Sequence, residues 1–497
     1  MDELWRDDTR WRTARAARVA WLVDSQAYFS AAYDALLKAR RSVLLLGWGF
    51  DPRTRLAPDG GVEGGEPDEI GRLLLRLSEQ RPDLEIRLLV WKSSLPISAT
   101  QEFFPHRARQ WFKGSRIKFI LDDCVPFGAC HHQKVLVIDD AVAFTGGGDF
   151  STDRWDSVAH RDKDTRRAHL GHSFHAPRHE VMVMVDGDAA RALGDHARER
   201  WARATGEVSV SEPDTLPDDA WPRNIRPDLR DIDINISRTE PAWRHHSATQ
   251  EIRRLARDSI LAAKWRIYME NQYFTSPLIA EALAARLAEP NGPEVVLIST
   301  HQAPSWFDRL TMDQVRGVMI RRLQEADVFG RFRAYSPVTP AGRAIIVHSK
   351  VTIIDDQIVR IGSANLNNRS LGFDTELEIG LETRFDTGRD TVSRFRSGLI
   401  GHFLSRDADA VERAMGTDFS LIRAIETLNR HGRLRPLQPQ PMGKFARFIA
   451  DFHLGDPTSH KDAMRPYKRR RYLDEQVREI AADHGVRRFI NSGRNPQ

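Results

Sequence analysis

The sequence predicts an α/β protein with two pseudo-symmetric lobes, each built from a mixed β-sheet flanked by helices, and with a C-terminal helical tail. Three observations support this prediction. A long sequence pattern occurs twice at a constant offset, strand-like apolar runs alternate with helical periodicity in both halves, and two Pro-rich segments interrupt the pattern. A chain of 497 residues is also long enough for roughly two to four domains.

The repeated pattern is the most specific feature of the chain. Residues 131–150 have the sequence HHQKVLVIDDAVAFTGGGDF, and residues 347–366 have the sequence VHSKVTIIDDQIVRIGSANL. One constant offset relates His132 to His348, Lys134 to Lys350 and Asp139 to Asp355. A duplicated domain explains this constant offset most simply. Duplication also predicts that both patterns meet at one cleft, at the interface of the lobes.

Each half has the strand and helix pattern of an α/β lobe. Helical periodicity at 68–79 and 315–326 separates short apolar runs, so strands and helices alternate. The expected strands are 42–47, 84–91 and 117–121 in the first half and 265–269, 294–299 and 332–335 in the second.

The Pro-rich segments set the expected boundaries. Residues 206–231 are rich in Pro and Asp and lack periodicity, which is typical of a linker. A second break at 432–441 precedes a basic tail. We therefore expect a first lobe at 1–205, a linker at 206–231, a second lobe at 232–431 and a helical tail at 432–497.

The tail contains one apolar helix face, formed by Phe445, Phe448, Ile449 and Phe452. Packing onto the lobes is the favoured explanation of this face, and contact with a membrane is the alternative.

Composition limits the classes of partner. With 41% hydrophobic and 29% charged residues, the chain is typical of a globular protein. Its formal charge of +5 suits anionic partners such as phosphates, a membrane surface or nucleic acid. With only two cysteines, a chain of this size needs no disulfide framework, and we expect no signal peptide and no transmembrane helix. We expect a cytoplasmic monomer that contacts a membrane surface peripherally.

The geometry of H-x-K separates its reactive residues from its aspartate. Residues i and i+2 of a strand share a face, so His132 lies beside Lys134, and His348 beside Lys350. Seven residues of strand span about 23 Å at ~3.3 Å each, which places the motif aspartate far from its own histidine. We expect Asp139 and Asp355 to be structural, capping a hairpin turn or bracing the other lobe.

Two histidines and two lysines at one cleft can carry out phosphoryl transfer. The lysines bind the non-bridging oxygens of a phosphate and stabilise the developing charge. One histidine attacks phosphorus and forms a phosphohistidine, while the other protonates the leaving oxygen and then activates water or an alcohol. Since the lysines supply the positive charge, we expect no metal and no cofactor.

These motifs, with GGGDF after the first and GSANLNNRS after the second, resemble those of the phospholipase D superfamily. DRWD at 153–156, RHEVMVMVDGDAA at 178–190 and YMENQYFTS at 268–276 are similar to the phospholipase D enzymes proper. The resemblance covers roughly residues 20–405.

The resemblance implies residue roles. His132 would be the nucleophile and His348 the general acid and base. Asp149, Ser363 and Asn365 would line the phosphate pocket. Glu180 and Glu376 would orient the histidines, and Glu378 competes with Glu376 because it lies on the same strand face.

The first half carries an insertion near 160–179. The spacing from His132 to Glu180 is clearly longer than the spacing from His348 to Glu376. The insertion contains His169, His172 and His175, but no cysteine or ordered acidic set completes a metal site there. We expect a flexible loop that faces the substrate.

Four functions remain open at this point. The favoured one is a phospholipase D that acts on a phospholipid. A cardiolipin-synthase-like phosphatidyltransferase would use the same chemistry. A nucleic-acid phosphodiesterase is disfavoured because basic residues are mixed with acidic ones and no stacking aromatics interleave them, so we expect no nucleic-acid partner. A purely lipid-binding module is also disfavoured, since paired acid/base groups serve no simple binding need.

Overall fold

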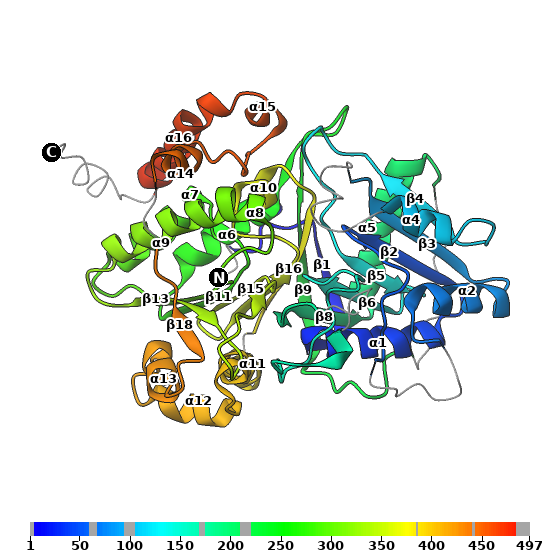
Figure 1. Ribbon diagram of the computed structural model, residues 1–497, viewed down its shortest axis with the longest axis horizontal. Coiled ribbons are helices and arrows are strands. Elements are labelled where there is room, and N and C mark those ends of the chain that lie inside the picture. Colours follow the sequence, from blue (N-terminus) through cyan, green and yellow to red (C-terminus); the bar gives the residue numbers. More distant parts are fainter. Residues whose placement is uncertain are drawn as a thin grey trace.

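The strands of both halves join in one mixed sheet. The computed structural model describes residues 4–58, 67–93, 105–167, 174–208, 220–383, 386–439 and 443–483. Outward from the antiparallel pair β1–β9, the strand order is β8-β6-β5-β2-β3-β4 in the first half and β17-β16-β15-β11-β12-β13 in the second. The directions of corresponding neighbours also match, with the two outer pairs parallel and the inner ones antiparallel. The duplication in sequence is therefore a duplication in topology (Figure 1).

The first half precedes the expected linker. Its elements are β1 (Arg12–Val23), α1 (Asp24–Lys38), β2 (Ser42–Gly47), α2 (Ile70–Gln80), β3 (Glu85–Trp91), α4 (Pro105–Trp111), β4 (Lys118–Asp122), β5 (Val135–Ile138), β6 (Val142–Gly146), the 3₁₀ turn η2 (Thr165–Arg167), β7 (Arg178–His179), β8 (Val181–Asp186) and α5 (Asp188–Thr205).

The second half repeats this order with additional helices. Its elements are β9 (Leu229–Glu240), β10 (Thr249–Gln250), α6 (Glu251–Ala262), β11 (Arg266–Glu270), α7 (Pro277–Leu287), β12 (Glu294–Ile298), α8 (Trp306–Asp308), the π-helical turn η3 (Arg309–Asp313), α9 (Gln314–Ala326), β13 (Phe332–Pro337), β14 (Ile346–Val347), β15 (Val351–Ile354), β16 (Ile358–Gly362), α10 (Asn368–Gly372), β17 (Glu376–Glu382), α11 (Asp386–Leu404), α12 (Ala408–Met415), α13 (Leu421–Leu428) and β18 (Leu434–Pro436).

Helices cover both faces of the sheet. One apolar core lies between the sheet and α5, α11, α12 and α13, and it includes strand residues from both halves. On the other side, α1, α2 and α4 cover the first half, and α6, α7 and α9 cover the second. This arrangement confirms the predicted α/β class. Among the described helices, none is both long and apolar enough to cross a bilayer.

The six expected strands are present, but the centre of the sheet differs from expectation. β1 was not among the expected strands, because its first seven residues are mostly Ala and Arg, which are not typical of strands. Pairing with β8 on one side and β9 on the other holds it extended. β9 begins at Leu229, inside the segment predicted as a linker, so that linker is shorter than expected.

The tail packs on the second half (Figure 1). It contains α14 (Lys444–Asp451), α15 (His460–Ala463), the 3₁₀ turn η4 (Pro466–Lys468) and α16 (Arg469–Asp483). Asp456 is fully buried and accepts hydrogen bonds from Thr275 Oγ1, Asn368 N and Arg369 N at 2.7, 3.0 and 2.8 Å. Ile449 is buried, whereas Phe448 is 52% exposed, so the predicted apolar face only partly packs. The side chain of Phe445 lies outside the described residues.

Candidate active site

Each motif histidine is held by the backbone of the opposite half. The His132 N–H donates to Thr375 O at 3.0 Å, and the His348 N–H donates to His179 O at 2.8 Å. The short parallel pair β7–β14 extends the second of these contacts. Strands β5 and β15 start one residue after the motif lysines, so each H-x-K segment lies at the edge of the sheet where the halves meet.

His132 is oriented by a carboxylate from the second half. Its Nδ1 lies 2.9 Å from Glu376 Oε2, and the Ser363 hydroxyl donates to the same oxygen. Glu376 is fully buried in β17. Burial, reinforced by the Lys134 and Lys350 cations, lowers the pKa of His132 well below its usual value. His132 is therefore an unprotonated imidazole at neutral pH, with Nδ1 held by Glu376 and Nε2 left for chemistry.

His348 has the reciprocal arrangement. Its Nδ1 lies 2.6 Å from Glu180 Oε1, which belongs to the first half. Arg154 Nη1 approaches the same oxygen at 3.8 Å. Burial, with the Lys350 cation next, lowers the pKa of the imidazole. Each half thus supplies one histidine and the carboxylate that contacts the histidine of the other half.

The glycines after the first motif allow this close approach. A Cβ on Gly147 would lie 2.8 Å from His348 O, and one on Gly148 would lie 2.6 Å from Glu180 Oε2. No side chain fits at either position without displacing a group of the site. The run GGG is therefore a packing requirement of the junction between the halves.

The two lysines lie beside the histidines. Lys134 Nζ is 3.2 Å from Asp149 Oδ2 and donates to His132 O at 2.9 Å. Lys350 Nζ donates to His348 O at 2.5 Å. Both lysines are almost fully buried. Two lysine amino groups are thus fixed next to the imidazoles, and burial lowers the pKa of Lys350 well below its usual value.

The predicted phosphate-pocket residues divide into two groups. Asp149 and Asn365 line the cavity that also contains His132 and His348. Ser363 is buried behind Glu376, and its hydroxyl accepts from Leu377 N at 3.1 Å while donating to the Glu376 carboxylate. We therefore expect Ser363 to act on His132 through Glu376 and not to contact a phosphate.

The motif aspartates bind turns in their own halves. Asp139 accepts from the backbone N–H groups of Arg40, Arg41 and Ser42 at 2.7, 2.7 and 2.8 Å. Asp355 accepts from those of Lys264, Trp265 and Arg266 at 2.7, 2.8 and 2.9 Å. Both aspartates have φ of 54°, at the tips of the hairpins β5–β6 and β15–β16. Neither one braces the opposite lobe, which was one of the two expected roles.

Glu378 lies in a different environment from Glu376. Its carboxylate forms a buried ion pair with Arg360, a neighbour on β16. Glu378 does not line the cavity, whereas Glu376 does. The geometry therefore favours Glu376 as the partner of His132.

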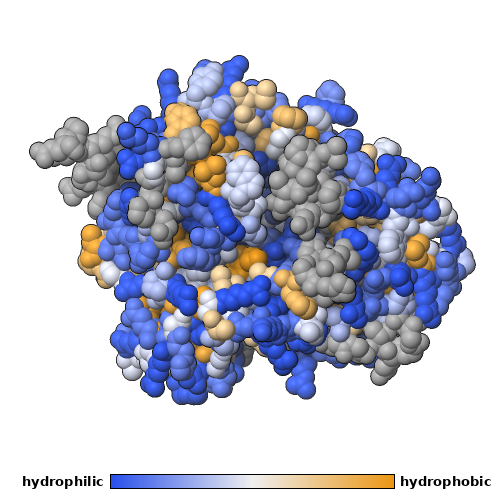
Figure 2. Space-filling view, in the orientation of Figure 1, coloured by the Kyte–Doolittle hydropathy of each residue, from blue (hydrophilic) through white to orange (hydrophobic). Residues whose placement is uncertain are grey.

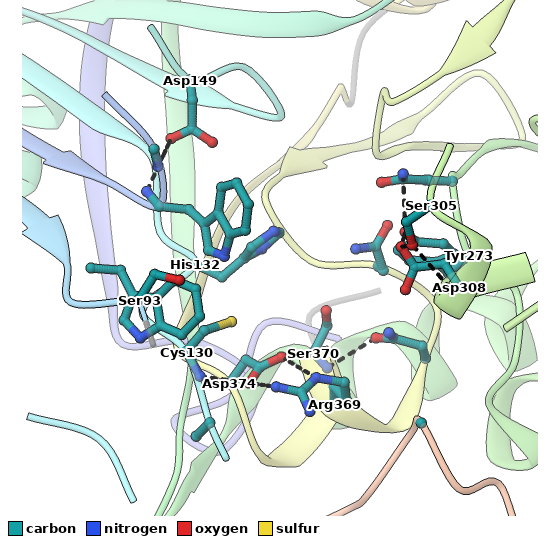
Figure 3. Close-up of a pocket in the computed structure, with 18 of the residues that line it drawn as sticks. Ser93, Cys130, His132, Asp149, Tyr273, Ser305, Asp308, Arg369, Ser370 and Asp374 are labelled. Carbon is teal, nitrogen blue, oxygen red and sulfur yellow. Dashed lines mark hydrogen bonds and ion pairs between the residues drawn. The ribbon is translucent and has the colours of Figure 1, made fainter. Parts of the chain in front are cut away.

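The histidines open into a cavity of about 870 Å³ between the halves. Figure 3 shows His132 pointing into this space, with Tyr273 and Asp308 across from it. Arg154 and Arg178 line the wall, and the Nε atom of each is buried without a hydrogen-bond partner in the described part of the chain. Sequence reasoning did not select these arginines, because only folding brings them to the motif. The available signals were the DRWD segment, which contains Arg154, and the position of Arg178 two residues before Glu180.

Similarity to known proteins agrees with this architecture. Residues 257–396 match a family model described as "Cardiolipin synthase, PLD-like domain". The chain is 22% identical to phospholipase D1 of Saccharomyces cerevisiae, over 73% of this chain and 27% of the relative. It is 24% identical to phospholipase D beta 2 of Arabidopsis thaliana, over 75% of this chain and 55% of the relative. The chain thus spans between about a quarter and about half of these curated relatives.

One solved structure has a similar fold along most of the chain. The phosphatidylserine synthase of Haemophilus influenzae Rd KW20 matches with a TM-score of 0.53 at 11% identity. The match covers 86% of this chain and 98% of that one. The likeness in fold therefore includes both halves.

Proposed function

Because this chain belongs to the phospholipase D superfamily, we propose that it is a metal-independent phospholipase D. It cleaves the distal phosphodiester of glycerophospholipids and passes the phosphatidyl group to water or to another alcohol. The observation that carries this proposal is the reciprocal pairing of His132 with Glu376 and of His348 with Glu180 at one cavity.

The first step is attack by His132. With Nδ1 held by Glu376, Nε2 attacks phosphorus and forms a P–N bond, while the bond from phosphorus to the head-group oxygen breaks. His348 donates a proton to that oxygen, so the head group leaves as a neutral alcohol. The bound phosphate's negative charge favours the protonated form of His348, which burial alone disfavours.

The second step reverses these roles. His348 takes a proton from water or an alcohol, whose oxygen attacks phosphorus and breaks the P–N bond. The product is phosphatidic acid with water and a new phosphatidyl ester with an alcohol, and His132 is regenerated. Arg154 lines the cavity, and Lys134 and Lys350 lie buried beside the two histidines. We propose that these three groups supply positive charge for the phosphoryl oxygens in both steps.

Exposed aromatic residues at the cavity support a membrane surface as the partner. Phe127, Trp306 and Phe307 line the cavity and are 82%, 67% and 49% exposed. The tail lies next to this rim, since His460 Nδ1 contacts Phe127 O at 3.3 Å. In the tail, Met464 and Tyr467 are 63% and 67% exposed. Figure 2 shows hydrophobic atoms gathered over the tail helices. We propose that this rim contacts the bilayer from which the substrate enters.

A cardiolipin-synthase-like phosphatidyltransferase is the second candidate. The description of the matching family model favours it, and the same two-step chemistry would serve it. In that case the second alcohol would be another phospholipid. The two candidates therefore differ in the acceptor and not in the reactive residues.

Product analysis tests the proposal. The protein is incubated with mixed phospholipid vesicles and ethanol, and the lipids are identified by mass spectrometry. We expect phosphatidic acid and phosphatidylethanol, both lost in His132→Ala and retained in His245→Ala, a substitution at an exposed histidine outside the cavity. Cardiolipin without phosphatidic acid from phosphatidylglycerol alone would favour the transferase. Full turnover by His132→Ala would contradict the mechanism.

A further inference from the structure

Four side chains converge behind the active site from distant parts of the chain. Asp24 is the first residue of α1, His160 lies in the insertion, His179 lies in β7, and His402 lies in the last turn of α11. Each can offer one ligand atom, and these four atoms lie within 4.8 Å of one another. None of the four lines the catalytic cavity. The catalytic proposal therefore leaves this cluster unused.

The distances are close to those of a four-coordinate metal site. His160 Nε2 and His402 Nε2 are 2.7 Å apart, and each lies 3.6 Å from Asp24 Oδ2. His179 Nδ1 lies 2.8 Å from Asp24 Oδ1. Ligand atoms around a tetrahedral zinc ion, at about 2.0–2.1 Å from the metal, are about 3.3 Å apart. The observed spacings lie on both sides of this value, and the four ligand atoms all lie within 4.8 Å of one another, so the side chains must shift inward to complete the shell.

Two further carboxylates hold the far sides of the imidazoles. His160 Nδ1 lies 2.9 Å from Asp156 Oδ2, and His179 Nε2 lies 2.9 Å from Glu270 Oε2. With these nitrogens facing outward, His160 Nε2 and His179 Nδ1 are the ring nitrogens that face the cluster. Metal-bound histidines commonly have such a carboxylate partner on the second nitrogen.

An unpartnered buried oxygen points into the cluster. Asp24 Oδ2 is fully buried and accepts no hydrogen bond from the described part of the chain. If His402 donates to His160 across their 2.7 Å contact, neither imidazole hydrogen reaches this oxygen. A metal ion satisfies Asp24 Oδ2 and both nitrogens at once. Buried carboxylate oxygens without a hydrogen bond are costly, so the arrangement favours a cation there.

The charges also match a divalent cation. Asp24, Asp156 and Glu270 are buried, and among them Asp156 has a nearby guanidinium, Arg167 at 3.5 Å. Asp24 and Glu270 form their ion pairs with histidines. A divalent ion bound by Asp24 and His179 would supply positive charge directly to Asp24 and, through His179, to Glu270. Buried charges are normally paired in this way or bound to a metal.

We propose that Asp24, His160, His179 and His402 bind one Zn²⁺ ion in a closed structural site. Three imidazoles and one carboxylate are a donor set suited to zinc, and a four-ligand site leaves no open position for substrate. The ion joins the halves, because His402 and the orienting Glu270 belong to the second half and the other ligands to the first. It also anchors catalytic geometry, since His179 precedes Glu180 and its carbonyl accepts from the His348 N–H.

Metal analysis of the untagged full-length protein tests this site. We expect about one zinc per chain by inductively coupled plasma mass spectrometry. His402→Ala and Asp24→Asn should each lose most of this zinc. His245→Ala, a matched histidine substitution at an exposed position, should retain it. His132→Ala should also retain it while losing turnover, so failure of the metal site and failure of the catalytic proposal are distinguishable.

Two measurements on the wild-type protein do not depend on the folding of any variant. Protein produced with Co²⁺ should show the intense visible absorption of four-coordinate cobalt bound to nitrogen and oxygen. Removal of metal with a chelator should lower the apparent Tm, and Zn²⁺ but not Mg²⁺ should restore it. The proposal is overturned if zinc-supplemented wild type contains less than about a tenth of an equivalent of metal and Zn²⁺ leaves its apparent Tm unchanged.

Discussion

Replacing Glu376 with Gln isolates the electrostatic contribution of the carboxylate that contacts His132. Glu376 Oε2 is 2.9 Å from His132 Nδ1 and also accepts from Ser363, while Oε1 has no hydrogen-bond partner in the described part of the chain. A glutamine can therefore place its carbonyl at the Oε2 position and keep both contacts. Burial raises the pKa of Glu376, and the cationic His132 ring of the transition state favours the charged form of this carboxylate. The substitution preserves the imidazole's orientation and removes that negative charge.

The size of the effect follows from that charge. Positive charge develops on the His132 ring as Nε2 bonds to phosphorus, and this ring lies about 4 Å from the Glu376 carboxylate. At an effective dielectric constant of about 20, two unit charges at that distance interact by about 4 kcal/mol. Loss of this stabilisation in the transition state corresponds to a decrease of about 10³-fold in kcat/KM.

The assay measures head-group release from a phospholipid that the wild-type protein turns over, with the apparent Tm as a check on folding. Glu378→Gln is the matched control, since it makes the same change on the same strand, β17. It removes the charge from the buried pair with Arg360, so we expect a lower Tm and turnover within about threefold of wild type. A Glu376→Gln protein within about tenfold of wild type would refute the assigned role. A loss of about 10³-fold in Glu378→Gln alone would transfer that role to Glu378.

Three other predictions concern the motif aspartate Asp139, the contact that fixes the tail, and the proposed nucleophile His132. Asp139→Ala removes a buried carboxylate that accepts from three backbone N–H groups at residues 40–42, so unfolding in urea should show a loss of about 3 kcal/mol, with turnover of the folded protein retained. An unchanged midpoint would contradict the role of Asp139 in holding this turn. Asp456→Ala removes the buried acceptor that fixes the tail, so limited proteolysis of the tail should be faster. Because Gly455 lines the cavity, we also expect a higher KM. Unchanged proteolysis and an unchanged KM would show that the contact is dispensable. Because burial lowers the pKa of His132, its imidazole should stay unprotonated through neutral pH, and kcat/KM should fall only below about pH 6.5. A decrease in kcat/KM that begins above this pH, or an NMR titration midpoint of His132 above it, would contradict this expectation.

Much of the fold was predictable because its information is local or repeated. The apolar runs that became β2, β3 and β12 show their character within a few consecutive positions, and the constant offset between the two motifs reveals the duplication without any structure. β1 was not predictable in this way. Its Ala- and Arg-rich first half favours no strand locally, and pairing with β8 and β9, which belong to different halves, holds the whole segment extended.

The candidate site also has a part that local spacing predicts and a part that only the fold decides. Spacing within each motif places the histidine beside its lysine, and the length of the strand separates both from Asp139 and Asp355. Whether Glu376 or Glu378 contacts His132 was left open, because both face the same side of one strand. The decision comes from Arg360, which pairs with Glu378 across β16 and β17.

The sequence by itself determined that this chain has two α/β halves with one H-x-K segment in each, because a repeat and an alternating pattern are properties of the order of residues. Only the tertiary structure decided that each histidine takes its carboxylate from the opposite half, since that pairing requires both halves to meet at β1 and β9. The insertion shows the same limit. His169 and His172 lie outside the described residues, and His175 contacts Ala176 O. His160 and His179 instead meet Asp24 and His402, which are far from them in the chain. Ligands at such distant positions form no recognisable spacing pattern in the sequence. The proposed zinc site therefore appears only once the chain is folded.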